Sequence, residues 1–321
     1  MGLKLAVDGG GTKLSMVLFD DELRLISKGL SGGVNVNQTS YEDSRANVVD
    51  CLRQVFGKEG NRQIDRLYVV FVGPVKILYE ELEKYATVAE VKPLREAKAG
   101  LLAGFMRDEG ILALSGTGSD VFYVRKDKRL NSVVGAWGPI LGDQGSGTWI
   151  GQKAIRKVVA GIEGWREPTL MYELIKRDWQ IDRGYEMVKK VHESVAPFRK
   201  VASLTRIVGE AARAGDRVAL SILREAGELM AIQTDCIIKR ENIPIEYQRV
   251  VCCGGAWKTH PLMYETFSKM LREMYPNITV EKPWFEHVLA GAVYEILKQD
   301  ISIDKAREKL SRHFPEYIID W

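Results

Sequence analysis

Two stretches of the chain repeat one pattern, in which an apolar strand ends in a glycine-rich turn and is followed by a hairpin. The copies cover residues 3–27 and 111–134, the second with a turn through Lys126-Asp127-Lys128. Because glycine lacks a Cβ, successive backbone N–H groups in such a turn can face a small anion. Hydroxyl groups add donors in both copies: Thr12, Ser115, Thr117 and Ser119. The repetition predicts two half-sites for one phosphorylated ligand.

Neither glycine turn fits the commoner phosphate-binding motifs. In the first copy, Gly11-Thr12-Lys13 leads into a strand, whereas a P-loop leads into a helix. Neither copy has the third glycine that opens a helix in a dinucleotide fingerprint. Taken alone, each turn is equally well a hairpin turn that uses glycine for its positive φ. Asp8 favours a functional site, because a carboxylate at the end of a buried strand is costly without a partner such as magnesium.

The composition is that of a globular enzyme. Of 321 residues, 45% are apolar and 28% charged, and 46 basic against 43 acidic residues leave a formal charge of +3. This near-balance argues against nucleic acid or a membrane surface as a partner. No apolar run reaches the ~20 residues of a membrane span, and no signal-peptide pattern is present, so we expect a cytoplasmic protein. The cysteines form no C-x-x-C pair, so we expect small buried thiols at Cys51, Cys236, Cys252 and Cys253.

Alternating helices and strands predict an α/β protein of two similar domains facing a cleft. We place the boundary at Glu109, which gives domains over 1–109 and 110–321, and the last helix is a candidate to pack on the first domain. Residues 146–239 are predicted to form a mainly helical insertion in the second domain. The other predicted elements are helices over 41–56 (capped by Ser40), 96–106, 261–275, 285–298 and 303–313, and strands over 66–72 and 248–253.

Four glycine-containing stretches follow one another along the chain: 8–13, 114–119, 135–147 and 252–257. The third, GAWGPILGDQGSG, is long and specific. Together they resemble, in family order, the N-acetylglucosamine kinase group of the BadF/BadG/BcrA/BcrD ATPase family. That family is part of the superfamily of acetate and sugar kinases, heat-shock chaperones and actin. The resemblance implies a duplicated ribonuclease-H-like fold.

The resemblance also implies a role for each stretch. Asp8 would hold magnesium, and the first loop would hold the phosphates of ATP through Gly10, Gly11, Thr12 and Lys13. The second loop would hold the β- and γ-phosphates through Gly116, Thr117 and Gly118, and the adenosine would be approached by Gly254 and Gly255. The sugar would lie against Asn35, Trp137, Gly138 and Asp143, where an amide, an indole face and a carboxylate suit a pyranose. On the residues alone, Gly254-Gly255 also fits a plain tight turn, and Trp137 a core tryptophan.

One position departs from the family pattern. The family has an aspartate at the start of the helix before the second glycine loop, as base toward the attacking sugar hydroxyl, and Glu96 stands there in this chain. Glutamate can do the same work if its longer side chain fits, although a misplacement of about 1 Å can cost about a hundredfold in rate. The alternative is a solvated carboxylate, which is favourable at a helix N-terminus.

The resemblance thus implies a homodimeric kinase that uses ATP and magnesium to phosphorylate the 6-hydroxyl of an amino sugar, N-acetylglucosamine or a related N-acetylhexosamine. Two alternatives stay open. A dehydratase-activating ATPase of the same family needs a bridging iron–sulfur cluster. Adjacent Cys252 and Cys253 point to opposite faces of a strand and cannot both face one cluster. A sugar-binding sensor without catalysis would bind sugar and produce no ADP.

Overall fold

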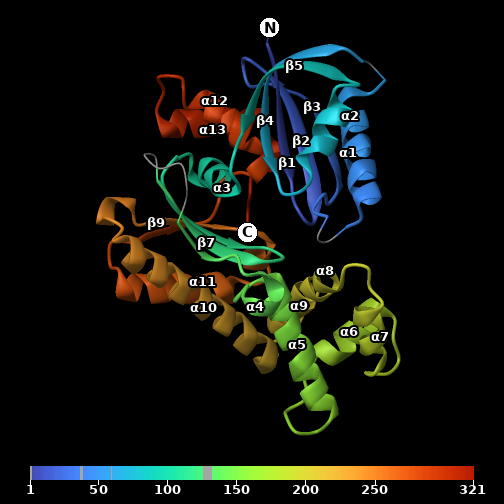
Figure 1. Ribbon diagram of the computed structural model, residues 1–321. Coiled ribbons are helices and arrows are strands. Elements are labelled where there is room, and N and C mark those ends of the chain that lie inside the picture. Colours follow the sequence, from blue (N-terminus) through green and yellow to red (C-terminus); the bar gives the residue numbers. More distant parts are fainter. Residues whose placement is uncertain (1, 37–38, 59, 126–131) are drawn as a thin grey trace. The chain divides into compact units, whose positions relative to one another are not determined.

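The computed structural model describes residues 2–36, 39–58, 60–125 and 132–321. Its contacts divide the chain into two compact units (Figure 1). Unit 1 comprises Met1–Glu109 and Lys282–Trp321, and unit 2 comprises Gly110–Glu281. Unit 1 is therefore built from both ends of the chain, whereas unit 2 is one continuous segment.

Unit 1 contains a five-stranded sheet in the order β3-β2-β1-β4-β5. β1, β2 and β3 are consecutive antiparallel neighbours, and β4 and β5 run parallel to β1. The strands are β1 (Leu3–Gly9), β2 (Lys13–Asp20), β3 (Leu25–Gly32), β4 (Arg62–Phe71) and β5 (Ala86–Pro93). The helices are α1 (Tyr41–Phe56), α2 (Val75–Leu82), α3 (Glu96–Phe105), α12 (Ala290–Ile296) and α13 (Ile303–His313), with the short 3-10 helices η3 (His287–Leu289) and η4 (Pro315–Tyr317).

The alternation of side chains along β1 explains why helices cover both faces of this sheet. Leu5 and Val7 pack in one buried cluster with α1 and α2. Ala6 points to the other face, where it packs with α3, η3 and α12. In Figure 1, α1 and α2 lie on one side of the unit 1 sheet, and α12 and α13 lie on the other. Asp8 follows Ala6 by two residues, so it points to the face that α3 and η3 cover.

Unit 2 repeats the strand order of unit 1. Its sheet runs β10-β9-β6-β7-β8, in which β6, β7 and β8 are antiparallel neighbours and β9 and β10 run parallel to β6. The strands are β6 (Gly110–Ser115), β7 (Ser119–Val124), β8 (Ser132–Gly135), β9 (Arg249–Cys253) and β10 (Thr279–Glu281). The helices are α4 (Gly138–Leu141), α5 (Gly147–Ile162), α6 (Met171–Trp179), α7 (Glu186–His192), α8 (Pro197–Ala202), α9 (Thr205–Arg213), α10 (Arg217–Glu241), η1 (Ile245–Tyr247), η2 (Gly255–Lys258) and α11 (Pro261–Met274).

A helical segment from α4 to α10 separates β8 from β9. α10 packs against α11 and against β7 and β8. Trp257 in η2 is fully buried, its ring packs on Phe267 of α11, and its indole N–H donates to the carbonyl of Ala113 on β6 (3.0 Å). These contacts hold the segment after β9 against the centre of the sheet.

The structure confirms the predicted duplicated α/β fold with its helical insertion. Helix α1 has the predicted bounds, and the Ser40 side chain accepts the N–H of Asp43 (3.0 Å). Two details differ from expectation. The helix predicted over 285–298 is η3 followed by α12. We expected a domain over 110–321 of which only the last helix would pack on the first domain, but the whole segment Lys282–Trp321 belongs to unit 1. The reason is that apolar side chains of this segment complete the core on the Ala6 face of the sheet: Phe285, Val288, Leu289 and Phe314. The predicted turn at 126–128 lies outside the described residues.

Candidate functional site

The first glycine loop, Gly9–Gly11, joins β1 to β2 and is supported from behind by its own unit. The N–H of Gly10 donates to the carbonyl of Lys13 (3.0 Å), and the N–H of Val34 donates to the carbonyl of Gly10 (2.9 Å). Gly33 passes so close that a Cβ there would collide with the carbonyl of Gly11, whereas a Cβ on Gly10 would meet no atom within 4 Å. The loop is therefore fixed on one side and open on the other, as an anion cradle requires.

Asp8 comes directly before this loop, and the charges around it come from two distant parts of the sequence. Burial raises the pKa of the Asp8 carboxyl, His287 and Lys13 lower it, and Glu286 raises it. Lys13 and Glu286 form an ion pair. Four ionisable side chains thus influence one another at the end of β1, of which the sequence predicted only Asp8 and Lys13.

Sequence reasoning missed Glu286 and His287, which come from the segment around η3. The four histidines of the chain have no metal-binding spacing, so nothing in the sequence pointed to this one. Nε2 of His287 is buried and has no hydrogen-bond partner among the described residues. Burial lowers the pKa of His287, Asp8 raises it, Lys13 lowers it and Glu286 raises it. With its pKa lowered, the ring is mainly neutral at pH 7.

The residues around Asp8 fit a magnesium ion that arrives with a nucleotide. Magnesium is usually held by one or two carboxylates together with substrate phosphates and water. Asp8 provides a hard oxygen ligand, and its burial is costly unless a cation compensates the charge. Among the described residues, no group of three or more His, Cys, Asp or Glu side chains is placed to hold a metal by itself. The chain thus offers part of a coordination shell, which phosphates would complete.

Asn35 and Glu96, the other predicted residues of unit 1, lie on different elements. Asn35 follows Gly33 and Val34, the segment behind the first loop, and its carbonyl accepts the N–H of Thr39 (3.1 Å). Glu96 is the first residue of α3 and is half-buried. Because α3 packs on the Ala6 face of the sheet, the structure puts Glu96, Asp8 and His287 on one face of unit 1.

The second glycine loop, Gly116–Gly118, joins β6 to β7 and is tied to residues 144–148 of the same unit. The N–H of Gly147 donates to the carbonyl of Gly116 (2.8 Å), and the hydroxyl of Thr148 donates to the carbonyl of Thr117 (2.7 Å). The Ser115 and Ser119 hydroxyls, which we expected to face a phosphate, are buried. They donate to the carbonyls of Gly145 (2.8 Å) and Gln144 (2.9 Å). That expectation was wrong for these two serines, since their hydroxyls hold the loop instead; the Thr117 side chain is half-exposed.

Gly254 and Gly255 follow β9 and differ in how much space a side chain would have at each position. Gly254 has a φ of 109°, and a Cβ there would collide with the carbonyl of Ser115. A Cβ on Gly255 would meet no atom within 4 Å, and the same is true of Gly116. Gly254 is therefore needed for a close approach of two backbones, while Gly255 and Gly116 border open space where a ligand has room.

The remaining predicted sugar residues, Trp137, Gly138 and Asp143, flank α4. Trp137 is 70% exposed, which excludes a core tryptophan. Asp143 is only 7% exposed and has a φ of 55°. Burial raises the pKa of Asp143, and backbone N–H groups of Ser119 and Gly138 donate to its carboxylate and lower it. A Cβ on Gly118 would lie 2.8 Å from Oδ2 of Asp143, so this carboxylate lies directly beside the second glycine loop.

Asp120, which the sequence analysis did not single out, lies next to Asp143. Burial and the charge of Asp143 raise the pKa of Asp120 to about 6, although the N–H of Ala136 donates to its carboxylate. Oδ1 of Asp120 is buried and has no hydrogen-bond partner among the described residues. The residue directly follows the Ser115–Ser119 motif, so its position in the sequence was an available signal.

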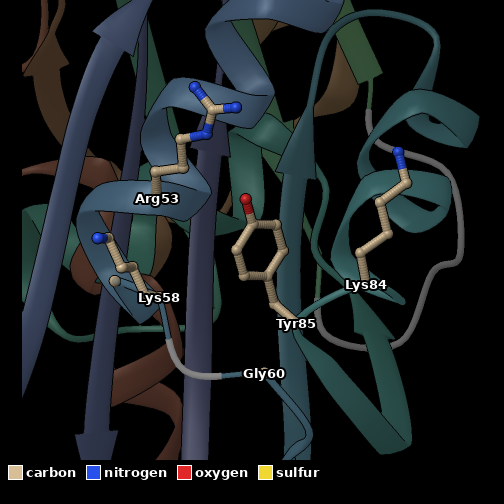
Figure 2. A pocket seen from close by; sticks show the side chains of 6 residues that line it. Arg53, Lys58, Gly60, Lys84 and Tyr85 are labelled. Carbon is tan, nitrogen blue, oxygen red and sulfur yellow. The ribbon is translucent and has the colours of Figure 1, made fainter.

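A separate hollow of about 560 Å³ lies in unit 1, where α1 ends and β5 begins. Figure 2 shows its side chains Arg53, Lys58, Lys84 and Tyr85. Arg53 and Lys58 lie at the C-terminal end of α1, and Lys84 follows the C-terminal end of α2. The helix dipole favours cations at such ends, so these three side chains need no ligand to explain them. None of the predicted site residues lines this hollow.

The cysteines and the helices limit other functions. Cys252 and Cys253 are buried in β9, and burial raises the pKa of the Cys252 thiol well above its usual value. Cys51 is buried as well. Cys236, in contrast to our expectation, is exposed, because it lies away from the apolar stripe of α10. Within the part of the chain that the structure describes, every helix is too short or too polar to cross a bilayer.

Comparison with known proteins agrees with these features. An N-acetylmuramic acid/N-acetylglucosamine kinase of Clostridium acetobutylicum is 25% identical over 86% of this chain and 92% of the relative. A glucosamine kinase of Vibrio cholerae is 23% identical over 70% of this chain and 76% of the relative. The crystal structure of a candidate N-acetylglucosamine kinase from Chromobacterium violaceum superposes with a TM-score of 0.67 at 20% identity, covering 92% of this chain and 99% of the other. The family model described as BadF/BadG/BcrA/BcrD ATPase matches residues 5–293, and the chain belongs to that family.

Proposed function

We propose that the protein is an ATP-dependent kinase that transfers the γ-phosphoryl group to the 6-hydroxyl of an amino sugar. The observation that carries the proposal is the repeated sheet, which ends its first strand in a glycine loop in each unit and places a half-buried carboxylate, Asp8, at one of them. Family membership and the names of the relatives support the same class of reaction.

In this proposal unit 1 supplies the charged groups. Gly10, Gly11 and Thr12 hold phosphate oxygens with backbone and hydroxyl donors, and Lys13 adds a positive charge that Glu286 orients. Asp8 would hold magnesium, which neutralises charge on the transferring phosphates. Asn35 would hold a sugar hydroxyl through its amide.

Unit 2 supplies the binding surfaces. Thr117 donates its hydroxyl to the β- or γ-phosphate, and the open space at Gly116 and Gly255 takes the nucleotide. Trp137 offers an exposed apolar face for the sugar ring, beside Gly138, and Asp143 accepts a sugar hydroxyl while two backbone N–H groups fix its orientation.

Glu96 is the proposed base. Phosphoryl transfer passes through a loose transition state, so the protein mainly positions the reactants and neutralises charge. The sugar hydroxyl loses its proton as it bonds to phosphorus, and a carboxylate at the start of α3 is placed on a fixed element to accept it. α3 is held by its buried residues Ala99 and Leu102, which limits movement of that carboxylate.

Two other functions have weaker support. An electron-passing dehydratase activator needs accessible thiolates, and Cys252 and Cys253 are buried. A sugar sensor without catalysis needs no base. The half-buried carboxylate of Glu96 at the N-terminus of α3 therefore favours a catalytic protein. A homodimer in the cytoplasm stays part of the proposal, and sedimentation of the purified protein tests the dimer.

The decisive experiment is an ADP-release assay with magnesium over N-acetylglucosamine, glucosamine, N-acetylmuramate, N-acetylmannosamine and glucose. We expect ADP release that depends on an amino sugar, with the phosphate on the 6-position by phosphorus–proton NMR of the product. ADP release that no sugar stimulates would contradict the proposal. Sugar binding by calorimetry with no ADP release would favour the sensor instead, and Glu96→Gln should then change nothing.

A further inference from the structure

Two carboxylates of unit 2 lie side by side at the proposed sugar-binding residues. Asp120 is the second residue of β7, where it pairs with Leu114 of β6 and Gly135 of β8. Asp143 follows α4, and the left-handed backbone at φ 55° turns it back toward the glycine loop. The two are close enough for the charge of Asp143 to raise the pKa of Asp120.

The described residues give this pair no cation. The groups that act on Asp120 are Asp143 and the N–H of Ala136, and those that act on Asp143 are the N–H groups of Ser119 and Gly138. Neither carboxylate forms an ion pair with a described lysine or arginine. Oδ1 of Asp120 is buried, and no described residue forms a hydrogen bond with it. Two partly buried negative charges without a counter-charge raise the free energy of the folded state, so binding of a positive group at this place is favourable.

The neighbouring residues indicate which positive group fits. Trp137 offers an exposed ring suited to a sugar, and the open face of Gly116 lies in the same unit. A neutral hydroxyl or an N-acetyl group can donate one hydrogen bond but leaves the charge of the pair uncompensated. An ammonium group brings three donors and a full positive charge, and so satisfies Oδ1 of Asp120 while it removes the repulsion between the carboxylates.

We propose that Asp120 and Asp143 form an ammonium-binding subsite, which makes the enzyme select amino sugars with a free, protonated amino group over their N-acetylated forms. This inference rests on the proposed sugar kinase function and narrows its substrate class. Asp120 is the residue that determines specificity, and Asp143 both orients the sugar and shares the charge.

The test compares three sugars that differ at carbon 2: glucosamine, N-acetylglucosamine and 2-deoxyglucose, which has no substituent there. At pH 7 we expect kcat/KM for glucosamine to exceed that for N-acetylglucosamine by about tenfold or more, the scale of one charged hydrogen bond. Asp120→Asn keeps the shape and removes the charge. It should lower the ratio of kcat/KM for glucosamine to kcat/KM for 2-deoxyglucose by about tenfold.

The control is Asp182→Asn, which removes the same charge from an exposed position in unit 2. It should leave kcat/KM unchanged for all three sugars. Preference of the wild-type enzyme for N-acetylglucosamine would overturn the inference, and so would an unchanged ratio between the sugars in Asp120→Asn. Both results leave the kinase function intact. If no sugar is phosphorylated, the proposed kinase function is wrong, and calorimetry of glucosamine binding then tests the subsite by itself. A loss of affinity for glucosamine in Asp120→Asn would support the subsite, and an equal affinity would refute it. Magnesium affinity that falls in Asp120→Asn without sugar would assign the pair to a metal and overturn the inference.

Discussion

Units 1 and 2 share one strand order, yet the loops at the ends of their first strands differ in chemistry. The loop after β1 is surrounded by ionisable groups, Asp8, Lys13, Glu286 and His287. The loop after β6 is bonded to its own unit by the hydroxyls of Ser115, Ser119 and Thr148, and the ionisable groups beside it, Asp120 and Asp143, are both acidic. The same backbone scaffold therefore carries acids and bases in one copy, and a hydrogen-bonded brace beside two acids in the other.

The two copies of a duplicated fold can therefore serve different tasks. A charged loop suits the step in which negative charge must be neutralised, and a braced loop suits precise placement of a ligand. We therefore expect changes in unit 1 mainly to reduce the rate of turnover. Changes in unit 2 should mainly alter binding and stability.

The largest effect is expected from Asp8→Asn. Loss of the charge that organises magnesium and the phosphates should lower kcat by on the order of ten-thousandfold. The pKa of Asp8 is raised in the folded protein, so ionisation of its carboxyl favours the unfolded state, and the neutral amide should not reduce stability. Thermal unfolding and ADP-release kinetics measure the two effects. The control is Asp65→Asn, which removes the same charge from an exposed position of β4. If Asp8→Asn were about as active as this control, Asp8 would not belong to the site.

Glu96→Gln should lower kcat by roughly a thousandfold, within the range of a positioned general base. Sugar affinity by calorimetry should change little, because glutamine keeps the size and one acceptor oxygen. Glu96→Asp restores the residue of the family and shortens the side chain by one methylene. We expect it to be slower than the wild type, since the site has been built around glutamate. Full activity of Glu96→Gln would show that unit 1 does not supply the base.

Gly254→Ala should destabilise the protein by about 3 kcal/mol, because a Cβ would collide with the carbonyl of Ser115 and the φ of 109° is strained for alanine. The adjacent Gly255→Ala is the matched control, since its Cβ would meet no atom within 4 Å. Chemical denaturation measures both. Equal stability of the two variants would mean that the brace of unit 2 does not depend on this close approach.

Thr117→Val should weaken ADP binding by about 2 kcal/mol, or roughly thirtyfold, as expected for the loss of a hydrogen bond to a charged oxygen. Calorimetry with ADP and magnesium measures the change. Thr87→Val on the exposed strand β5 serves as the control for the substitution itself. An unchanged affinity in Thr117→Val would remove the second loop from the phosphate site.

The smallest effect concerns Asp120→Asn and the pH dependence of stability. The pKa of Asp120 rises from 3.8 to about 6 on folding, so the ionised carboxylate disfavours the folded state above about pH 6. Asparagine should therefore stabilise the protein at pH 8 by about 1 to 2 kcal/mol, less than a full shift implies because solvent screens the group. The gain should shrink as the pH falls through 6 and vanish below about 4. Thermal unfolding at pH 4, 6 and 8 checks this, and a gain that grew toward low pH would contradict it.

Local signals in the sequence were sufficient for much of the fold. Helix α1 was predictable because Ser40 caps it and its apolar residues recur at helical spacing, and α13 has a similar cap at Ser302. The edge strands β5 and β10 were not predicted. β5 is mostly exposed and lacks a clear alternation of apolar residues, and β10 has only three residues. Their pairing with β4 and β9 stabilises them, and such long-range contacts leave little trace in local sequence.

The candidate site was predictable where glycines and acids stand in recurring motifs, as at Asp8, Gly116 and Asp143. It was not predictable where a residue enters from a distant element. His287 carries no pattern of its own, and it reaches Asp8 only because the last part of the chain packs on the β1 sheet. The serines of the second loop were misjudged for a related reason: a hydroxyl looks the same in sequence whether it faces a ligand or a backbone carbonyl of its own unit.

The return of the last segment to unit 1 has a consequence for how the protein is made. Unit 2 is one continuous stretch, so all of its core residues have been synthesised once the chain reaches residue 281. The face of β1, β2 and β4 that carries Ala6, Val17 and Tyr68 must wait for Phe285 and Leu289. At about 5–20 residues per second, that apolar face stays uncovered for roughly ten to forty seconds after its own strands emerge. We therefore expect unit 2 to fold first during translation, and nascent chains that stop before residue 282 to depend on chaperones.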